Sequence, residues 1–223
     1  MLLSVWGGAW IYRTYSSRAA IKNFEADRVH SSADNSPSEI EPAPDSRVDF
    51  SLWSMKRVEA YRESVVTDGD RPMAVLRIPK IHLEVPVYND TDDLTLNRGV
   101  GRILGTAHVG ERGNLGIAGH RDGFFRGLKD LAQNDEIILD RISQSDTYVV
   151  REIQIVQPED VSVLKPTPLP SVTLVTCFPF YYVGSAPQRY IVRASLKEFD
   201  RSHREVSQSK PAVTSTNTKE NQR

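Results

Sequence analysis

The sequence predicts an all-β domain with short helices in its connections, and three observations support this fold class. Short apolar runs rich in Val, Ile and Leu follow one another from Met73 onward. Turn-forming Gly, Pro, Asn and Asp separate these runs, and little helical periodicity lies between them. This texture is typical of a barrel or a sandwich of eight short strands. The predicted strands are 73–78, 83–88, 102–107, 114–120, 135–141, 146–157, 171–177 and 189–197.

Three connections between these strands carry local helical patterns. Residues 92–100 and 124–131 each predict a single helical turn. Residues 158–170 contain four prolines and predict a loop, with one 3₁₀ turn near 161–164.

A longer helix is predicted before the strands, over residues 50–68. Val58, Tyr61 and Val65 fall at i, i+3 and i+7, the spacing of one helical face. Asp49 or Ser51 could cap its start. We expect this helix to pack on the β domain, which spans residues 73–198.

The flanking segments are predicted to be less ordered. Residues 23–49 form a predicted flexible linker, because the stretch 31–47 is polar, bears prolines and has few large apolar side chains to bury. Residues 199–223 are polar and aperiodic and predict a disordered tail.

The first 22 residues predict a partial membrane anchor. The run from Met1 to Tyr12 is apolar, but it is shorter than the ~20 residues that span a bilayer. The basic residues Arg13, Arg18 and Lys22 follow the run, so the positive-inside rule taken literally would place the domain in the cytoplasm. We expect instead that the written start lies inside an anchor. A short interfacial or buried helix is the alternative.

Charge and cysteine content exclude several classes of protein. The chain has 28 basic and 29 acidic residues, without the basic stripe of a nucleic-acid-binding protein. Its single cysteine excludes an internal disulfide and a Cys-cluster metal site. Neither a cofactor nor a metal is predicted.

The single cysteine, Cys177, ends the predicted strand 171–177 and precedes an aromatic, proline-containing loop. A lone thiol is most often an inert buried side chain. A reactive thiol needs a base or a cation nearby, because the thiolate is the nucleophile. The aromatic side chains of the loop could cover the end of the barrel or contact a ligand.

Two of the five histidines are candidates for that base. His30 and His203 fall in the predicted linker and tail, and His82 falls in a turn. His108 and His120 remain, each at the end of a predicted strand. His120 is favoured because Gly116, Ala118 and Gly119 before it allow a close approach. A structural role for either histidine is the alternative.

Arg189 is the candidate cation. It opens the last predicted strand, across the loop from Cys177. If strands 171–177 and 189–197 pair antiparallel, its guanidinium lies near the thiol and could stabilise an oxyanion. Arg193 lies deeper along the same strand and is the rival. An exposed surface arginine is the alternative reading.

These motifs together resemble the sortase family of cysteine transpeptidases. The resemblance rests on "TLVTC" at 173–177, the arginine at 189, "AGHRD" at 118–122 and "LRIPKIHLEVPVY" at 76–88. It covers nearly all of the predicted β domain. The sequence around Cys177 is most similar to class D or related sortases.

The resemblance implies an eight-stranded barrel with its active site at one end. It implies that Cys177 attacks the threonine carbonyl of an LPxT-type sorting signal at the C-terminus of a secreted protein. His120 would exchange protons with the leaving and incoming amines, and Arg189 would hold the substrate and the oxyanion. The Thr176 hydroxyl and the backbone N–H of Phe178 are implied to help bind the substrate.

The resemblance also implies partners and a location. The acyl group would pass to an amine, either a peptidoglycan cross-bridge or a pilin lysine. The N-terminal segment would hold the protein at the cell membrane, with the catalytic domain extracytoplasmic. Some sortases bind calcium through loop carboxylates, but Glu111, Glu159 and Asp160 are scattered and more typical of solvated side chains.

Other functions stay open from the sequence. A cysteine hydrolase of similar peptides would use the same residues and release the acyl group to water. An L,D-transpeptidase is disfavoured, because its cysteine and arginine lie within a short Ser-x-Gly-Cys-x-Arg run. A non-catalytic peptide-binding barrel would be expected to lack one of His120, Cys177 and Arg189.

Overall fold

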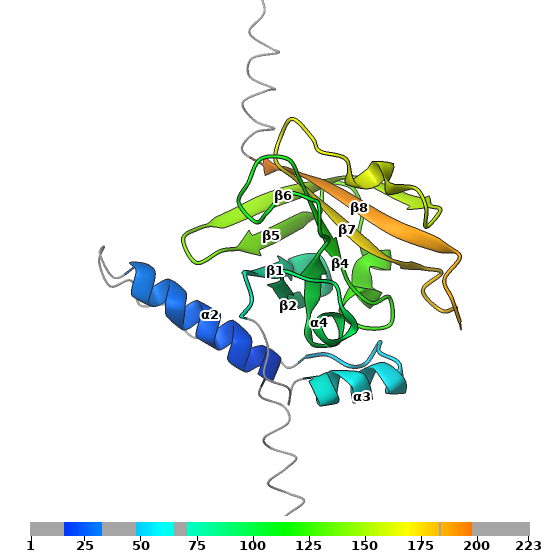
Figure 1. Cartoon of the computed structure of the whole chain (residues 1–223), viewed down its shortest axis with the longest axis horizontal. Helices are drawn as coiled ribbons and strands as arrows, with labels where there is room; N and C mark the ends of the chain where they lie inside the picture. Colours follow the sequence, from blue (N-terminus) through cyan, green and yellow to red (C-terminus); the bar gives the residue numbers. More distant parts are fainter. Residues whose placement is uncertain (1–15, 33–47, 65–70, 183, 198–223) are drawn as a thin grey trace, which may run out of the picture.

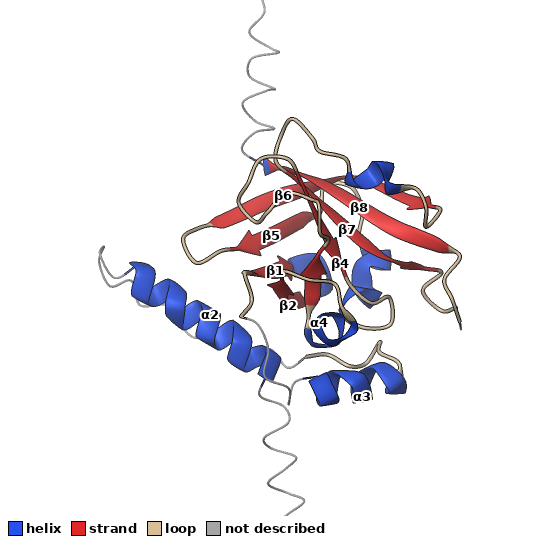
Figure 2. Ribbon diagram, in the orientation of Figure 1, coloured by secondary structure: helices blue, strands red, loops and turns tan. Residues whose placement is uncertain are grey.

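The eight strands close into a barrel in the order β1-β2-β3-β4-β7-β8-β6-β5 (Figures 1 and 2). The computed structural model describes residues 16–32, 48–64, 71–182 and 184–197. The predicted all-β barrel with short helices in its connections is confirmed. The strands are β1 (Ala74–Ile78), β2 (Leu83–Tyr88), β3 (Val100–Arg102), β4 (Asn114–Ala118), β5 (Glu136–Asp140), β6 (Ser145–Val156), β7 (Ser171–Phe178) and β8 (Gln188–Leu196).

Seven strands lie within two residues of their predicted limits, but the third differs. The prediction for 102–107 was wrong, because β3 is Val100–Arg102 and the chain turns immediately after it. Gly105 has a φ of 83° in this turn, a conformation that favours glycine. The Thr106 N–H donates to the Ile103 carbonyl at 3.3 Å and closes the turn.

The predicted short helices are present in the connections. They are α4 (Asp93–Arg98), η2 (Phe124–Asp130) and η3 (Val161–Leu164), and one unpredicted 3₁₀ turn, η1 (Pro79–Ile81), joins β1 to β2. The Asp92 side chain caps α4 by accepting from the Thr95 N–H at 2.7 Å.

The helix predicted before the strands is α3 (Met55–Ser64), which lies inside the predicted range 50–68. Its cap differs from the prediction, since neither Asp49 nor Ser51 lies at its start. The Ser54 hydroxyl instead accepts from the Arg57 N–H at 3.2 Å. The predicted face holds for Val58 and Tyr61, which are buried, whereas Val65 lies outside the described residues.

A second helix, α2 (Ser16–Ser32), occupies residues that the sequence assigned to the anchor and the linker. Residues 23–32 are therefore helical rather than linker. Ile21 and Phe24 are buried against Val75 on β1, which gives this stretch an apolar contact that its composition does not suggest. Residues 1–15, 33–47 and 198–223, on which the anchor, linker and tail predictions fall, lie outside the described residues.

No helix in the described part of the chain has both the length and the apolar character needed to cross a membrane. The helices α2 and α3 lie below the barrel in Figure 1, and α3 packs against α4.

Side chains from the strands and η2 fill the barrel core. The core includes Leu76, Val85, Ile117, Leu139, Val150, Leu174, Val192 and, from η2, Phe125 and Leu128. The segment before α3 closes one end of this core through edge-to-face aromatic contacts. Trp53 contacts Phe124 with ring centroids 4.7 Å apart, and Phe50 contacts Tyr61 at 5.4 Å. These contacts fix α3 beside η2, which follows His120 in the chain.

A smaller cluster lies on the outer face of β7 and β8. Val156, Val163 and Ile191 form it, with Leu164 and Val175 packed against them. The η3 turn supplies Val163 and Leu164, so the loop between β6 and β7 covers this face.

Asn114 attaches that loop to the sheet. The buried amide group donates to the carbonyl oxygens of Val163 at 2.9 Å and Lys165 at 3.2 Å. Its oxygen accepts from the hydroxyls of Thr173 at 2.7 Å and Ser171 at 3.3 Å. One side chain therefore links β4, β7 and the loop.

We expect the substitution Asn114→Ala to lower the free energy of unfolding by about 2–3 kcal/mol, because it leaves buried carbonyl and hydroxyl groups without partners. Urea unfolding followed by circular dichroism measures the change. Asn23→Ala, on the exposed surface of α2, is the matched control and should change stability by less than about 0.5 kcal/mol. A loss at Asn114 no larger than at Asn23 would contradict this role.

Candidate active site

The antiparallel register of β7 and β8 sets Cys177 directly opposite Arg189. Directly paired residues of neighbouring strands project from the same face of the sheet. The strand pairing therefore places the backbone of Arg189 beside that of Cys177, as the sequence predicts. The pairs Val175–Ile191 and Thr173–Arg193 lie on the same face, further from the strand end.

The parallel pairing of β4 with β7 brings His120 to the same place. Ala118 pairs with Val175, and the Gly119 N–H donates to the Val175 carbonyl at 3.1 Å. If this register is continued for two residues beyond the pair Ala118–Val175, His120 lies level with Cys177. The candidates His120, Cys177 and Arg189 thus come from the ends of β4, β7 and β8 at one rim of the barrel.

The floor beside the thiol is apolar. Val175 and Ile191, one step further along the same face, belong to the cluster that η3 covers. Cys177 is half-buried and has a free thiol. A substrate reaching the thiol along this face would therefore contact apolar side chains of the sheet and of the loop between β6 and β7.

The glycines before His120 are required by close packing. A Cβ at Gly119 would lie 2.6 Å from the ring of Phe125, and a Cβ at Gly116 would lie 3.0 Å from Leu164. The first contact is impossible without movement of the buried Phe125 ring. The glycines on which the choice of His120 was based thus make room for the core at Gly119 and for the covering loop at Gly116.

His120 is held by its backbone, while its imidazole is less constrained. The His120 carbonyl accepts from the N–H groups of Gly123 at 3.1 Å and Phe125 at 3.3 Å. The Nε2 atom is buried and finds no hydrogen-bond partner among the described residues. Burial and, to a lesser extent, the nearby Arg57 charge lower the pKa of His120 to about 4, although the charges of Asp122 and Asp93 oppose the shift.

Four polar residues around His120 were not identified from the sequence. Arg57 Nε donates to Asp122 Oδ1 at 3.1 Å, and the Ser54 hydroxyl donates to Asp122 Oδ2 at 2.9 Å. Arg57 Nη1 also donates to Asn97 Oδ1 on α4. Asp122 follows His120 by two residues, a proximity that could have drawn attention to it. Nothing local identifies Arg57, which lies 65 residues away from its partner in sequence.

The Arg189 guanidinium bonds to its own loop. Its Nη1 atom donates to the carbonyl oxygens of Ala186 at 3.3 Å and Gln188 at 3.1 Å. Contact with a bound peptide would require these bonds to be exchanged for bonds to the substrate. The rival Arg193 forms an ion pair with Glu152 at 3.3 Å and lies opposite Thr173, further from the rim.

Thr176 and Phe178 point to the face opposite the thiol, because side chains alternate along β7. The buried Thr176 hydroxyl donates to the Gly119 carbonyl at 2.7 Å and so links the two strand ends. The Phe178 ring packs against Phe180 and Tyr190. Both side chains therefore have structural contacts, and their predicted contribution to substrate binding stays a prediction.

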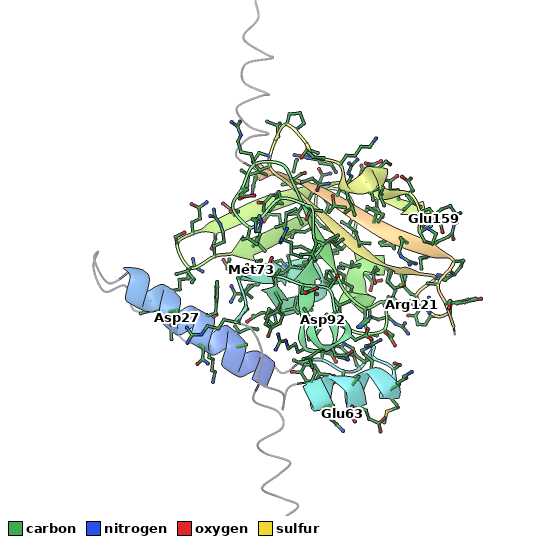
Figure 3. All side chains as sticks on the ribbon, in the orientation of Figure 1. Asp27, Glu63, Met73, Asp92, Arg121 and Glu159 are labelled. Carbon is green, nitrogen blue, oxygen red and sulfur yellow. The ribbon has the colours of Figure 1, made fainter. Side chains whose placement is uncertain are left out.

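Two arginines attach the loop between β7 and β8 to the segment after His120. Arg121, labelled on the right of Figure 3, donates to the carbonyl oxygens of Pro179 at 3.1 Å and Gly184 at 2.8 Å. Arg126 donates to the Phe180 carbonyl, and its guanidinium lies 4.1 Å from the centre of the Tyr181 ring. Phe180 is buried in the core and covers the barrel end, which is one of the two roles expected for the aromatic side chains of this loop. Tyr181, in contrast, is 70% exposed.

The other candidates from the sequence lie apart from this rim. His108 is exposed in the loop before β4, where its N–H donates to Glu111 at 2.9 Å. The Asp160 carboxylate accepts from the Ser162 N–H at 3.0 Å and caps η3. Among the described residues no group of three or more His, Cys, Asp or Glu side chains could hold a metal ion.

Similarity to known proteins agrees with this fold. The Sortase domain family matches residues 76–197. Sortase D of Bacillus subtilis (strain 168) is 36% identical over 119 residues, which cover 53% of this chain and 60% of that protein. A Clostridium perfringens Sortase D5 transpeptidase has a TM-score of 0.52 at 28% identity, covering 62% of this chain and 88% of that one. Sortase C-1 from Actinomyces oris has a TM-score of 0.53 at 28% identity, and the match covers 78% of this chain and 98% of that one.

The fold and the rim define a closed β-barrel protein with one candidate thiol nucleophile. This chain belongs to the sortase family, whose domain covers more than half of it. Members of the family, including the curated Sortase D and Sortase A relatives, are cysteine transpeptidases. The predicted resemblance is confirmed, and similar structures come from several sortase classes. The chain spans about 60% of the length of the Sortase D relative.

The lowered pKa of His120 predicts a specific pH dependence of stability. The folded state holds the imidazole neutral, so the unfolded chain binds more protons as the pH falls through 6.5, the ordinary pKa of histidine. Stability from this group is present above that pH and is lost as the pH falls toward about 4. Between pH 7 and pH 5 we expect His120 to account for a loss of about 2 kcal/mol.

Urea unfolding of the wild type and His120→Gln at both pH values measures this contribution. The variant should lose less stability on acidification than the wild type, whereas the exposed-site control His108→Gln should behave like the wild type. An identical pH dependence in wild type and His120→Gln would contradict a depressed pKa.

Proposed function

We propose that this chain is a cysteine transpeptidase that cleaves an LPxT-type sorting signal after its threonine and transfers the acyl group to an amine. The observation that carries this proposal is the register that pairs Cys177 with Arg189 and sets His120 level with them. Family membership supports the reaction class. The LPxT signal itself rests on the resemblance of the motifs around Cys177.

In the first half-reaction the Cys177 thiolate attacks the threonine carbonyl carbon and forms a C–S bond. The carbonyl oxygen becomes an oxyanion, which the Arg189 guanidinium stabilises by donating hydrogen bonds. The C–N bond of the peptide then breaks, and the protonated His120 gives its proton to the leaving amine. A thioester on Cys177 and a released C-terminal fragment result.

In the second half-reaction an amine attacks the thioester carbon. His120, now neutral, takes a proton from the incoming nitrogen, and the C–S bond breaks to regenerate the thiolate. We propose a peptidoglycan cross-bridge or a pilin lysine as the natural amine. Water gives the hydrolysis product instead, so the ratio of the two products depends on how well the amine is positioned.

The low pKa of His120 shapes this reaction. The first step needs an imidazolium beside a thiolate, and burial near Arg57 disfavours the imidazolium. Only a minor fraction of molecules therefore holds the competent pair at neutral pH. The acidic limb of the activity profile should accordingly lie well below the ordinary histidine value of 6.5.

We further propose that residues 1–22 contribute to a membrane anchor and that the catalytic barrel, residues 73–198, works outside the membrane. Sortases are typically membrane-associated with an extracellular catalytic domain, which supports this arrangement. The substrates would then be secreted proteins that carry the sorting signal at the C-terminus.

The acyl-enzyme provides the direct test. We expect a mass increase on Cys177 after incubation with peptides that contain LPxT, and no adduct in Cys177→Ala. Arg189→Met should slow acylation by about 10²- to 10³-fold, because one oxyanion donor is lost. The control Arg193→Met removes an arginine of the same strand and should stay within about threefold of the wild type.

Addition of an amine separates the two candidate reactions. A ligated peptide should replace the free acid if the chain is a transpeptidase, and free acid alone would assign it as a cysteine hydrolase. Absence of any Cys177 adduct across the peptide library would reject the proposed function and favour a non-catalytic binding barrel.

A further inference from the structure

Helix α3 places a charged pair beside His120. Ser54, which caps the helix, donates its hydroxyl hydrogen to Asp122 Oδ2 at 2.9 Å and accepts from the Arg57 N–H at 3.2 Å. Arg57 Nε forms an ion pair with Asp122 Oδ1 at 3.1 Å. Both side chains are partly buried, with 19% and 31% of their area exposed, so solvent screens this pair less than a surface ion pair.

The pair contacts the segment that carries His120. A Cβ at Gly123 would lie 3.3 Å from Arg57 Cγ and 3.6 Å from His120 Cβ, so the arginine stem and the histidine pack against the same residue. The Gly123 N–H donates to the His120 carbonyl at 3.1 Å. Arg57 and His120 are therefore both close neighbours of one glycine.

The helix itself is held firmly enough to position these groups. Trp53, next to the capping serine, packs edge-to-face on Phe124 at 4.7 Å and on Tyr61 at 5.7 Å. Asn97 on α4 accepts from the Arg57 guanidinium. Figure 1 shows α3 directly beneath α4, and Figure 3 shows Asp92 of the α4 cap on the same side of the barrel as Glu63 of α3.

We propose that Arg57, carried to the rim by α3, acts with Asp122 as a pair of positioning residues for His120. The arginine holds the Asp122 carboxylate and packs on Gly123, and the carboxylate balances the arginine charge beside the imidazole. This inference deepens the proposed function, since it rests on His120 being the proton-transfer residue. Helix α3 is then part of the working site although it contributes no strand to the barrel.

The charges of the pair act on His120 in opposite directions. The Arg57 charge disfavours the imidazolium, whereas Asp122 and, from α4, Asp93 favour it. The other titratable or charged groups near the rim are Cys177 of β7, Arg189 of β8, and Arg121 and Arg126, which hold the β7–β8 loop. Removing the Arg57 charge leaves Asp122 and Asp93 unopposed, and removing the Asp122 charge leaves Arg57 opposed only by Asp93.

Because the two charges act on His120 in opposite directions, their removal distinguishes a positioning role from a purely structural one. Arg57→Gln should raise the pKa of His120, and Asp122→Asn should lower it, each by at least about half a pH unit. The double variant should return close to the wild type. The readout is the NMR titration of the His120 ring protons in the full chain, assigned by their loss in His120→Gln.

Activity provides the second readout. Both single variants should lower kcat/KM for the LPxT peptide by about tenfold, mainly through kcat, because the imidazole is displaced. The acidic limb of the pH profile should move up in Arg57→Gln and down in Asp122→Asn. Arg57→Lys keeps the charge and should leave the His120 titration close to the wild type while it recovers only part of the activity.

The matched controls are Arg62→Gln and Glu63→Gln, which change the same charges on exposed positions of α3. Both should leave the titration and the activity unchanged. Shifts of equal sign in Arg57→Gln and Asp122→Asn, or no shift in either, would overturn the proposal. Because the titration needs no substrate, it decides the proposal even if the chain fails to form an acyl-enzyme. If Arg57→Gln does not fold, the downward shift of the His120 pKa in Asp122→Asn and the partial loss of activity in Arg57→Lys still test the proposal.

Discussion

The candidate site depends on the parallel pairing of β4 with β7 at their last residues. The Gly119 N–H donates to the Val175 carbonyl at 3.1 Å, and the Thr176 hydroxyl donates to the Gly119 carbonyl at 2.7 Å. These two bonds extend the strand pairing past Ala118 and set His120 level with Cys177. Because side chains alternate with a period of two, a slip of one residue would turn the thiol into the barrel.

The rim combines groups that come from distant parts of the chain. Arg189 lies opposite Cys177 by antiparallel pairing, while α3 and α4 supply charged groups that act on His120. The barrel is a rigid frame, because its core is filled and its strands close on one another. The connections between strands are held differently from the barrel. The β7–β8 loop, for example, is attached by hydrogen bonds from the guanidinium groups of Arg121 and Arg126. Exchange of such bonds would allow the site to admit the peptide substrate that we propose.

Most of the barrel could be predicted from the sequence, because alternation and turn residues mark strands locally. The third strand was placed wrongly, since the apolar Ile103 and Leu104 extend the pattern into a turn. Residues 23–32 were assigned to a linker because the buried contact of Phe24 with Val75 depends on the closed barrel. The cap of α3 was misassigned because the helix begins at Met55, several residues later than its apolar pattern suggests.

The sequence alone determined the chemistry available to this protein: one thiol, a histidine after a glycine-rich strand, and an arginine opening the strand after the thiol. These features are local, so residue type and spacing are enough to find them. Only the tertiary structure decided that Thr176 faces away from the thiol and bonds to Gly119, and that Arg57 reaches Asp122 across 65 residues. Such contacts depend on strand register and on the docking of a helix, which arise from packing of the whole barrel and leave no periodic trace in the chain.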